Sequence, residues 1–247
     1  MTSFGPAYVA LYDMLYSDKP YEAEAARLAD LIRAESPDAR RVVDYGTGTG
    51  RYAQLLSAHG FEVVGVEPNP HMLALARARD TTAQFLPLAE RDQVEGSDVV
   101  CALFDVVSYM TDNSTLLDFL RWAHSRLPFH GLLIFDCWYG PAVQTQGPER
   151  RWKEVTQKDR HLLRLTSPEH RRDDCTVLIR HRVLSWERDR VLGDFTEEHL
   201  LRYFFAHELR LLLENAGFAL STLGTLQAPT TPPTVGNWST LVTAHRR

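Results

Sequence analysis

Apolar and polar positions along the first two-thirds of the chain follow two alternating patterns. Short runs of β-branched or other apolar residues predict buried strands at residues 41–45, 61–67, 83–88, 97–104 and 130–138. Apolar residues at helical spacing predict helices at residues 21–35, 51–60, 71–79 and 114–127. A strand and helix repeat with short connections is typical of a parallel sheet covered by helices.

The pattern changes after Pro141. Between residues 150 and 192, charged and apolar residues alternate, which predicts antiparallel strands with one face in water. Turn signals stand at Ser167–Pro168 and at Arg188–Asp189–Arg190. This part of the chain is therefore predicted to be an antiparallel layer inserted into the repeat, at about residues 145–204.

The C-terminal part returns to the first pattern. A helix is predicted at residues 206–218, and two last strands near 218–226 and 238–244. The chain contains no internal repeat and no low-complexity linker. We therefore predict a single domain over residues 1–247.

Charge and cysteine content narrow the class of protein. A formal net charge of -5 gives no electrostatic reason to expect nucleic acid or an anionic membrane as partner. Cys101, Cys137 and Cys175 are odd in number and widely separated, which favours buried thiols over disulfides or a zinc site. The N-terminus lacks the pattern of a signal peptide, and no apolar run is long enough to span a bilayer. A cytoplasmic location is the expectation.

The stretch "VVDYGTGTGRY", residues 42–52, carries the first chemical signal. Glycines between a strand and a helix let a ligand approach the backbone closely. A dinucleotide site would need a further glycine where Arg51 stands. The acid at Asp44 would oppose a pyrophosphate but suits a ligand with sulfonium and ammonium groups. Glu67, at the end of the next strand, can accept hydrogen bonds from both ribose hydroxyls, a role common to NAD and S-adenosylmethionine sites.

With these residues the sequence resembles the class I S-adenosylmethionine-dependent methyltransferases. The resemblance rests on "VVDYGTGTGRY", "EVVGVEPNPHMLALAR", "SDVVCALFDVVSYM" and "LPFHGLLIFDCWYG", which cover most of residues 8–141. The "YD-x-LY…K-x-Y-x-x-E" segment from Tyr12 to Glu24 is similar to the small-molecule branch that includes amino-sugar N,N-dimethyltransferases of antibiotic pathways. The resemblance implies a doubly wound, Rossmann-like α/β fold with a mostly parallel seven-stranded sheet, an inserted antiparallel layer and an N-terminal helical lid over about residues 1–36.

The resemblance also implies a cofactor and its contacts. The cofactor would be S-adenosylmethionine, the product S-adenosylhomocysteine, and no metal is expected. Tyr21 is the leading lid residue, because its hydroxyl could donate a hydrogen bond to the cofactor's carboxylate. The expected cofactor contacts are Tyr12, Tyr21, Asp44, Tyr45, Gly46, Thr47, Gly48, Arg51, Glu67, Pro68, Met72, Ala89, Glu90, Leu103 and Phe104.

Candidates for the acceptor side follow the predicted strand ends and the insertion. Methyl transfer is an in-line displacement that rests on proximity, and a general base is needed only for a protonated nucleophile. The candidate catalytic residues are His199, Asp105 and Tyr109. The candidate substrate contacts are Tyr16, Trp138, Tyr139, Arg202 and Tyr203, of which Arg202 and Tyr203 could meet an anionic group. Each of these residues could instead serve packing alone.

The sequence therefore predicts methyl transfer to a nitrogen or oxygen of a small molecule, in specialised-metabolite or sugar biosynthesis. Two alternatives stay open: a non-catalytic protein that binds S-adenosylmethionine, and a nicotinamide-dependent dehydrogenase. A nucleic-acid methyltransferase is disfavoured because "FDVVSYM" lacks the Asn/Asp-Pro-Pro-aromatic run expected after the fourth strand. Exposed antiparallel strands in the insertion offer an edge for a homodimer.

Overall fold

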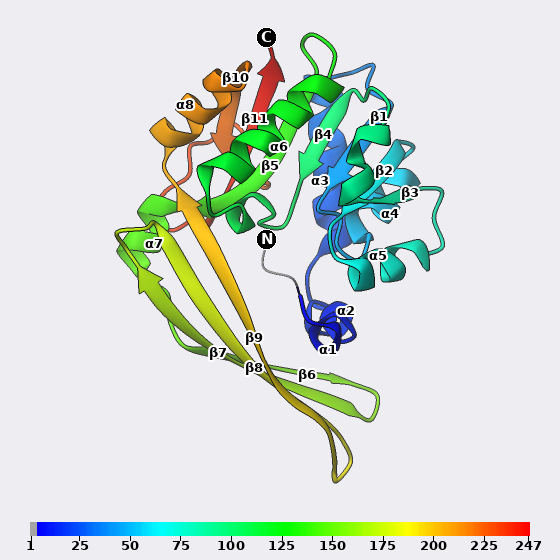
Figure 1. The fold of residues 1–247 in the computed structure, drawn as a ribbon, viewed down its shortest axis with the longest axis vertical. Helices are drawn as coiled ribbons and strands as arrows, with labels where there is room; N and C mark the ends of the chain where they lie inside the picture. The colour runs from blue at the N-terminus through cyan, green and yellow to red at the C-terminus, as the bar shows by residue number, and fades with distance from the viewer. Residues whose placement is uncertain (1–3) are drawn as a thin grey trace.

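The computed structural model describes residues 4–247 (Figure 1). Five of the predicted strands lie parallel in the order β3-β2-β1-β4-β5. Their apolar runs are buried on both faces, as expected for strands between two helical layers. These strands are β1 (Arg41–Tyr45), β2 (Glu62–Glu67), β3 (Gln84–Pro87), β4 (Val99–Ala102) and β5 (Leu132–Tyr139).

Two C-terminal strands extend this sheet beyond β5. Strand β11 (Ser239–Arg246) pairs antiparallel with β5, and β10 (Phe218–Gly224) pairs antiparallel with β11. The predicted seven strands are thus present, but in the described part of the chain they belong to one sheet of eleven strands. The doubly wound α/β fold is confirmed, and the count differs because the insertion joins the same sheet.

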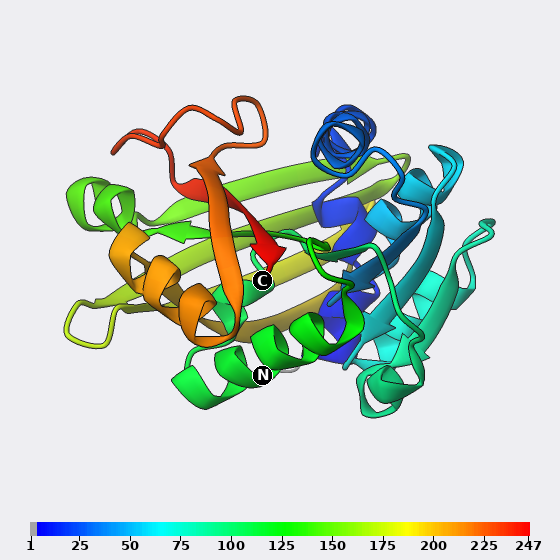
Figure 2. The ribbon, with the colours of Figure 1, turned by 90° about the horizontal axis from the view of Figure 1, so that it is seen from above.

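Helices cover both faces of the sheet. On one face, α3 (Tyr21–Glu35), α4 (Arg51–Ala58) and α5 (Pro70–Arg77) bury an apolar cluster that includes Leu28 and Ala53. On the other face, α6 (Asn113–Arg126) and α8 (Ala206–Asn215) bury a second cluster. Seen from above, α6 and α8 lie on one side of the molecule and α3 on the other (Figure 2). The amphipathic pattern of these helices accounts for the two layers.

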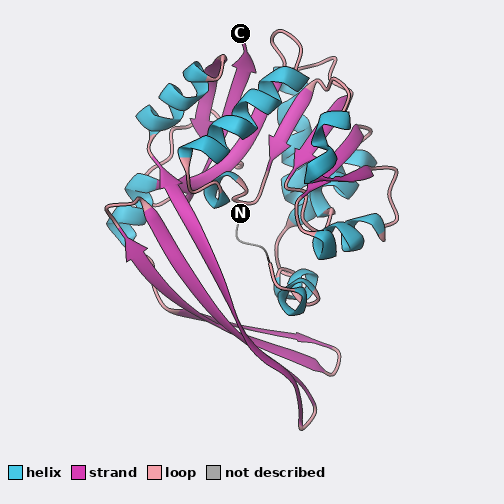
Figure 3. Cartoon of the chain, in the orientation of Figure 1, coloured by secondary structure: helices cyan, strands magenta, loops and turns pink. Residues whose placement is uncertain are grey.

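The insertion forms a curved antiparallel layer below the core (Figure 3). It follows a short helix, α7 (Gly140–Gln146), and its strands pair in chain order. The last strand joins the core, because its end pairs parallel with β5 at Trp138 and Tyr139. The strands of the insertion are β6 (Arg151–Gln157), β7 (Arg160–Arg171), β8 (Thr176–Glu187) and β9 (Arg190–Phe204).

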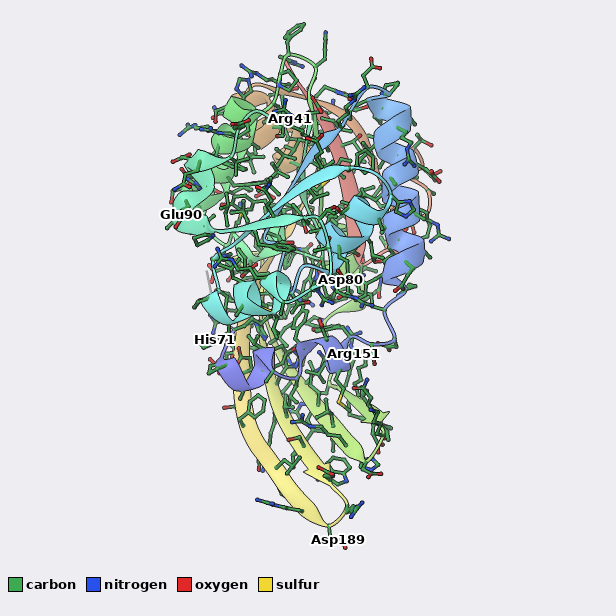
Figure 4. The ribbon with its side chains drawn as sticks, turned by 90° about the vertical axis from the view of Figure 1, so that its right-hand side faces the viewer. Arg41, His71, Asp80, Glu90, Arg151 and Asp189 are labelled. Atoms are coloured by element: carbon green, nitrogen blue, oxygen red, sulfur yellow. The ribbon has the colours of Figure 1, made fainter. Side chains whose placement is uncertain are left out.

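One turn predicted in the insertion is wrong. Strand β7 runs straight through Ser167–Pro168, and the chain turns instead at residues 158–159 and 172–175. Proline is tolerated here because β6 pairs with β7 only as far as Thr166, so β7 has an unpaired edge at Pro168 on that side, while Ile179 of β8 pairs with it on the other. The turn predicted at Arg188–Asp189–Arg190 is present, with Asp189 at the tip of the β8–β9 hairpin (Figure 4).

The N-terminal segment divides into two parts with different neighbours. Helices α1 (Pro6–Val9) and α2 (Tyr12–Leu15) pack against the insertion, through a cluster that includes Leu162 and Val183. Helix α3 instead belongs to the core. Motion of this segment as a lid over residues 1–36 stays a prediction, and residues 1–3 lie outside the described part of the chain.

The structure also bears on the thiols and on membrane insertion. Cys101 and Cys137 are buried, Cys175 is partly buried, and all three are free. Within residues 4–247, no helix has the length and apolar character needed to cross a membrane.

Candidate active site

The glycine loop connects β1 to α4 and needs its glycines for different reasons. Gly46, Gly48 and Gly50 have φ values of 75°, 58° and 78°, in the left-handed region that favours glycine. A Cβ on Gly46 would also lie 2.7 Å from both γ carbons of Val106, whereas a Cβ on Gly48 would meet nothing within 4 Å. The loop is therefore locked by backbone conformation throughout and by close packing at Gly46.

Two buried carboxylates flank this loop. The Oε2 atom of Glu67 accepts a hydrogen bond from the Gly48 N–H at 2.8 Å, and Oε1 accepts one from the Asn69 N–H at 2.9 Å. The Oδ2 atom of Asp44 accepts a hydrogen bond from the Thr47 hydroxyl at 2.6 Å. Burial raises the pKa of Glu67 to about 7 and that of Asp44 to about 6. The polar end of the site thus holds two oriented carboxyl groups whose pKa values lie close to neutral pH.

A cavity of about 460 Å³ lies between the glycine loop, the N-terminal helices and the insertion. It gathers twelve of the fifteen predicted cofactor contacts, although these come from five separate stretches of the chain. They are Tyr12, Tyr21, Asp44, Gly46, Thr47, Gly48, Arg51, Glu67, Pro68, Met72, Leu103 and Phe104. These residues meet at the carboxyl ends of the parallel strands, which is the edge of the sheet where α/β proteins bind ligands.

Three predicted cofactor contacts do not line this cavity. The ring of Tyr45 packs in the core against Phe119 and Trp122 of α6, and its hydroxyl accepts a hydrogen bond from Arg91 at 3.2 Å. Side chains alternate between the faces of a strand, so Tyr45 shares the α6 face with Val43 and is turned away from the ligand side.

Ala89 and Glu90 fail for another reason. They belong to a short 3-10 helix, η1 (Leu88–Gln93), and both are exposed. Glu90 lies at the outer edge of the molecule (Figure 4). Neither residue lines the cavity, because the chain after β3 turns outward there.

The opposite end of the cavity is aromatic and contains the three catalytic candidates. His199, Asp105 and Tyr109 all line it, together with the predicted substrate contacts Tyr16 and Trp138. Among residues 4–247, no group of three or more His, Cys, Asp or Glu side chains is arranged to hold a metal ion. The candidates gathered here are thus aromatic rings, the imidazole of His199 and the carboxylate of Asp105.

His199 is buried without a hydrogen-bond partner. It is 2% exposed, and neither ring nitrogen is hydrogen-bonded within the described residues. Its ring lies 4.8 Å from that of Phe4, 5.4 Å from that of Tyr8 and 5.8 Å from that of Tyr109, between ring centroids. Burial, and then the charge of Arg164, lower the pKa of His199 to about 4. The imidazole is thus neutral and a weak base, and its two ring nitrogens are buried with unused donor and acceptor capacity.

Asp105 follows β4 in a strained turn. Phe104 and Asp105 both have φ of 65°, which is uncommon for residues other than glycine. The Asp105 N–H donates to Oδ1 of Asp136 at 2.9 Å, whereas Oδ1 of Asp105 is buried without a partner. Burial raises the pKa of both carboxyls, and repulsion from Asp105 raises that of Asp136 further. One oxygen of Asp105, a residue that lines the cavity, is therefore buried without a hydrogen-bond partner in the described part of the chain.

The remaining substrate candidates lie elsewhere. Arg202 faces away from the cavity and binds Glu208 and Asn113, because it lies on the opposite face of β9 from His199 and Leu201. Tyr203 shares the face of His199 but lies beyond the cavity, with its hydroxyl 3.4 Å from both Gln144 and the Arg172 carbonyl. Tyr139 alternates with Trp138 and points to the other face of β5. These three residues do not line the cavity.

Several lining residues were not predicted from the sequence. Ile179 and His181 on β8 share a face with His199 and Leu201 on β9, as the pairing of Ile179 with His199 shows. The two-residue alternation of the insertion was the signal that could have found them. The other unpredicted lining residues are Phe4, Thr49, Tyr52, Asn69, Pro70 and Val106.

The N-terminal motif residues Lys19 and Glu24 support the turn at Phe104. Lys19 Nζ pairs with Oε2 of Glu24 at 2.6 Å and lies 4.4 Å from the centre of the Phe104 ring. The Tyr52 hydroxyl donates to the same Glu24 oxygen. These groups line a second cavity of about 380 Å³, which shares Phe104 and Asp105 with the first.

Comparison with known proteins identifies the family. A model of the methyltransferase domain family matches residues 18–223, most of the chain. The chain belongs to this methyltransferase family.

Individual relatives are similar to this chain over most of its length. A putative methyltransferase, YqeM of Bacillus subtilis, is 24% identical over 221 residues, 86% of this chain and 85% of its own length. The dTDP-3-amino-3,4,6-trideoxy-alpha-D-glucopyranose N,N-dimethyltransferase of Streptomyces venezuelae is 25% identical over 219 residues, 86% of this chain and 90% of its own. Among solved structures, the amino pentose methyltransferase CalS10 from Micromonospora echinaspora has a TM-score of 0.76 at 24% identity, covering 100% of this chain and 99% of that one. This structure supports the methyltransferase fold.

Proposed function

We propose that this protein transfers a methyl group from S-adenosylmethionine to an amine of a small-molecule acceptor. Membership of the methyltransferase family supports methyl transfer, and a relative that covers most of the chain is named for N,N-dimethylation of an amino sugar. The observation that carries the proposal is a single cavity lined by Glu67 and Asp44 and also by Asp105, one of whose oxygens has no partner within residues 4–247.

At the glycine-loop end, the geometry suits the cofactor. Each Glu67 oxygen has one backbone donor and keeps a lone pair for a ribose hydroxyl. Asp44 supplies a negative charge for the sulfonium and ammonium side of the ligand. Tyr21, which lines the same cavity, is placed in the proposal as a donor to the cofactor's carboxylate.

At the aromatic end, the reaction needs position more than acid-base catalysis. The nitrogen lone pair attacks the methyl carbon, the carbon–sulfur bond breaks with its electron pair going to sulfur, and S-adenosylhomocysteine leaves. In the proposal, Oδ1 of Asp105 accepts a hydrogen bond from the amine N–H and thereby aims the lone pair. The same carboxylate then stabilises the positive charge that forms on nitrogen.

An amine suits this site better than a hydroxyl. A hydroxyl nucleophile must lose its proton during attack, and His199, with its pKa lowered to about 4, is too weak a base for that task. The ammonium form of an amine can lose its proton to water before it binds, so the neutral amine attacks without a protein base, and its ammonium product is a natural partner for Asp105. The role of Tyr109 in this proposal is to close the cavity beside His199.

The test combines binding with turnover. Calorimetry should first show binding of S-adenosylmethionine, and methyl transfer is then measured with matched acceptors that differ only in an amine or a hydroxyl, such as 2-phenylethylamine and 2-phenylethanol. Asp105→Asn should lower kcat/KM for the amine roughly 10- to 100-fold, the cost of losing a hydrogen bond to a charged group, without changing cofactor affinity. Asp80→Asn, on an exposed residue, is the control.

Two results would contradict the proposal. Transfer to the hydroxyl partner in preference to the amine would contradict N-methylation. Binding of S-adenosylmethionine without turnover of either acceptor class, including amino sugars, would favour the non-catalytic binding protein instead.

A further inference from the structure

The acceptor half of the cavity is made of aromatic and aliphatic surfaces. Phe4, Tyr12, Tyr16, Tyr109 and Trp138 all line it, and the insertion adds Ile179 and Leu201. Among the fully buried side-chain polar atoms of the described lining residues, those without a protein partner are the two His199 nitrogens and Oδ1 of Asp105. Such a surface suits a flat or apolar body that carries one or two polar groups.

The charges that line the cavity are almost all negative. Asp44, Glu67 and Asp105 are carboxylates, and among the described lining residues Arg51 is the only Lys or Arg. Arg51 begins α4 beside the glycine loop, where its guanidinium lies 5.3 Å from the Tyr21 ring centre and 3.4 Å from a Glu22 oxygen. The one cation therefore lies at the cofactor end and already has a carboxylate partner.

Cations just behind the walls are also engaged. Arg164 donates to the hydroxyls of Tyr8 at 3.3 Å and Tyr16 at 3.0 Å, which places it behind these rings. Lys19 pairs with Glu24, and Arg79 pairs with Asp13. Binding an anion with any of them would require breaking an existing pair or displacing an aromatic ring.

A nucleotide diphosphate would find little to hold it in this cavity. A diphosphate is usually held by free Arg or Lys side chains or by backbone N–H groups at a glycine loop or helix N-terminus. Here the Gly48 N–H is already bound to Glu67, and the loop over residues 225–238, next to the cavity walls, contains no charged residue. The three lining carboxylates would repel the added negative charge.

We infer that the acceptor is a phosphate-free amine whose apolar body stacks in the aromatic half of the cavity, in contrast to the dTDP-linked sugar named for the Streptomyces venezuelae relative. This inference rests on the proposed N-methylation, because Asp105 is assigned to the amine. Specificity then comes from ring stacking and from His199, which can hydrogen-bond a second polar group of the acceptor.

The experiment uses the full chain saturated with S-adenosylhomocysteine. Thymidine diphosphate and inorganic pyrophosphate are titrated by calorimetry, and methyl transfer is compared for one 3-amino sugar presented as the dTDP conjugate and as the methyl glycoside. We expect no binding of either anion up to about 1 mM, the range of weak contacts. We also expect kcat/KM for the glycoside to exceed that for the conjugate by roughly tenfold or more, because the cavity offers the diphosphate no cationic partner. A tenfold ratio corresponds to about 1.4 kcal/mol.

The outcomes separate this inference from the proposed function. Saturable binding of thymidine diphosphate, or faster methylation of the dTDP conjugate, overturns the inference while supporting N-methylation. If S-adenosylmethionine does not bind at all, the proposed function fails, and diphosphate titration of the ligand-free chain still decides whether the cavity accepts a diphosphate. A His199→Phe variant that keeps cofactor affinity and loses amine turnover supports the assignment of the aromatic half to the acceptor, whereas unchanged turnover counts against it.

Discussion

The two ends of the cavity are built on opposite principles. The glycine-loop end is made of backbone N–H groups and buried carboxylates that hold one another, as in the contacts of Glu67 with Gly48 and Asn69. The aromatic end is made of side chains from the N-terminus, the ends of β4 and β5 and the insertion, and its residues His199 and Asp105 hold buried polar atoms without partners among the described residues. The carboxylates of the first end are thus held by hydrogen bonds within the protein, whereas one oxygen of Asp105 and both nitrogens of His199 at the second end are not. This difference teaches that the two ends should respond differently to substitution.

The largest effect is expected from Glu67→Ala. We expect the affinity for S-adenosylmethionine to fall roughly 100-fold or more, because two hydrogen bonds to an ionised group are lost and each contributes about 1.5–3 kcal/mol. Calorimetry measures the affinity, and the melting temperature reports whether the loop has also lost its support. Glu62→Ala, at the exposed start of β2, is the control and should bind normally. An unchanged affinity would remove Glu67 from the cofactor site.

A pair of glycine substitutions tests how rigid the first end is. Gly46→Ala should lower the free energy of unfolding by about 1–3 kcal/mol more than Gly48→Ala, because only the Gly46 Cβ would collide with Val106. Both substitutions share the cost of a left-handed backbone, roughly 1–2 kcal/mol, so their difference isolates the packing contribution. Urea unfolding of the two variants measures it. Equal destabilisation would mean that the loop can shift away from Val106.

The acids at the first end predict a pH dependence. Burial raises the pKa of Glu67 from 4.5 to about 7, so the folded protein keeps a proton that the unfolded chain has lost over this range. The free energy of unfolding of the ligand-free protein should therefore fall as pH rises from about 4.5 to about 7, by at most roughly 1.4 kcal/mol per pH unit for this group. Asp44, with its pKa raised to about 6, acts in the same direction.

Cofactor affinity should change with pH in the opposite sense. The ionised form of Glu67 is the better acceptor for ribose hydroxyls, so affinity should rise by up to roughly tenfold per pH unit below about pH 7. Calorimetry between about pH 5.5 and about pH 8, a range around the pKa of Glu67, measures the affinity. Thermal melts over the same range measure the stability of the ligand-free protein. Glu67→Gln should flatten the affinity profile, and a profile that keeps its slope in this variant would assign the titration to another group.

The smallest effect is expected from Arg202→Ala. This side chain binds Glu208 and Asn113 on the face of β9 turned away from the cavity. The kcat/KM for an amine acceptor should stay within about twofold of the unchanged protein, since no ligand contact is lost. A large rise in KM would show that acceptors reach this outer face of the insertion.

The sequence was most informative where the site is local. Asp44, Gly46 and Glu67 lie at the ends of the neighbouring strands β1 and β2. The glycine spacing that forms the turn after β1 therefore also places these residues against the ligand site. The aromatic end depends on which face of each strand points inward. His199 and Trp138 were found, but Arg202 and Tyr139 fall on the opposite faces of β9 and β5. A shift of one residue reverses the side of a strand, which the motif alone did not resolve.

Tyr45 illustrates the same limit within the glycine motif. Its neighbour Asp44 points to the ligand side, so strict alternation sends the Tyr45 ring to α6, where Phe119 and Trp122 receive it. A single sequence does not reveal that Tyr45 contacts Phe119 and Trp122, which lie more than seventy positions later in the chain. The side chain at position 45 thus serves packing against α6 and not ligand binding.

Strand β9 carries a consequence for how acceptor preference could evolve. Its 15 residues span about 50 Å, from the outer hairpin to the pairing of Tyr203 with Trp138. His199 and Leu201 therefore lie on one continuous, hydrogen-bonded strand whose C-terminal end pairs with the core sheet. Under the proposed function, substitutions at these two positions would change the shape presented to the acceptor and leave the residues of the glycine loop in place. Acceptor preference could then change by single substitutions without loss of cofactor binding.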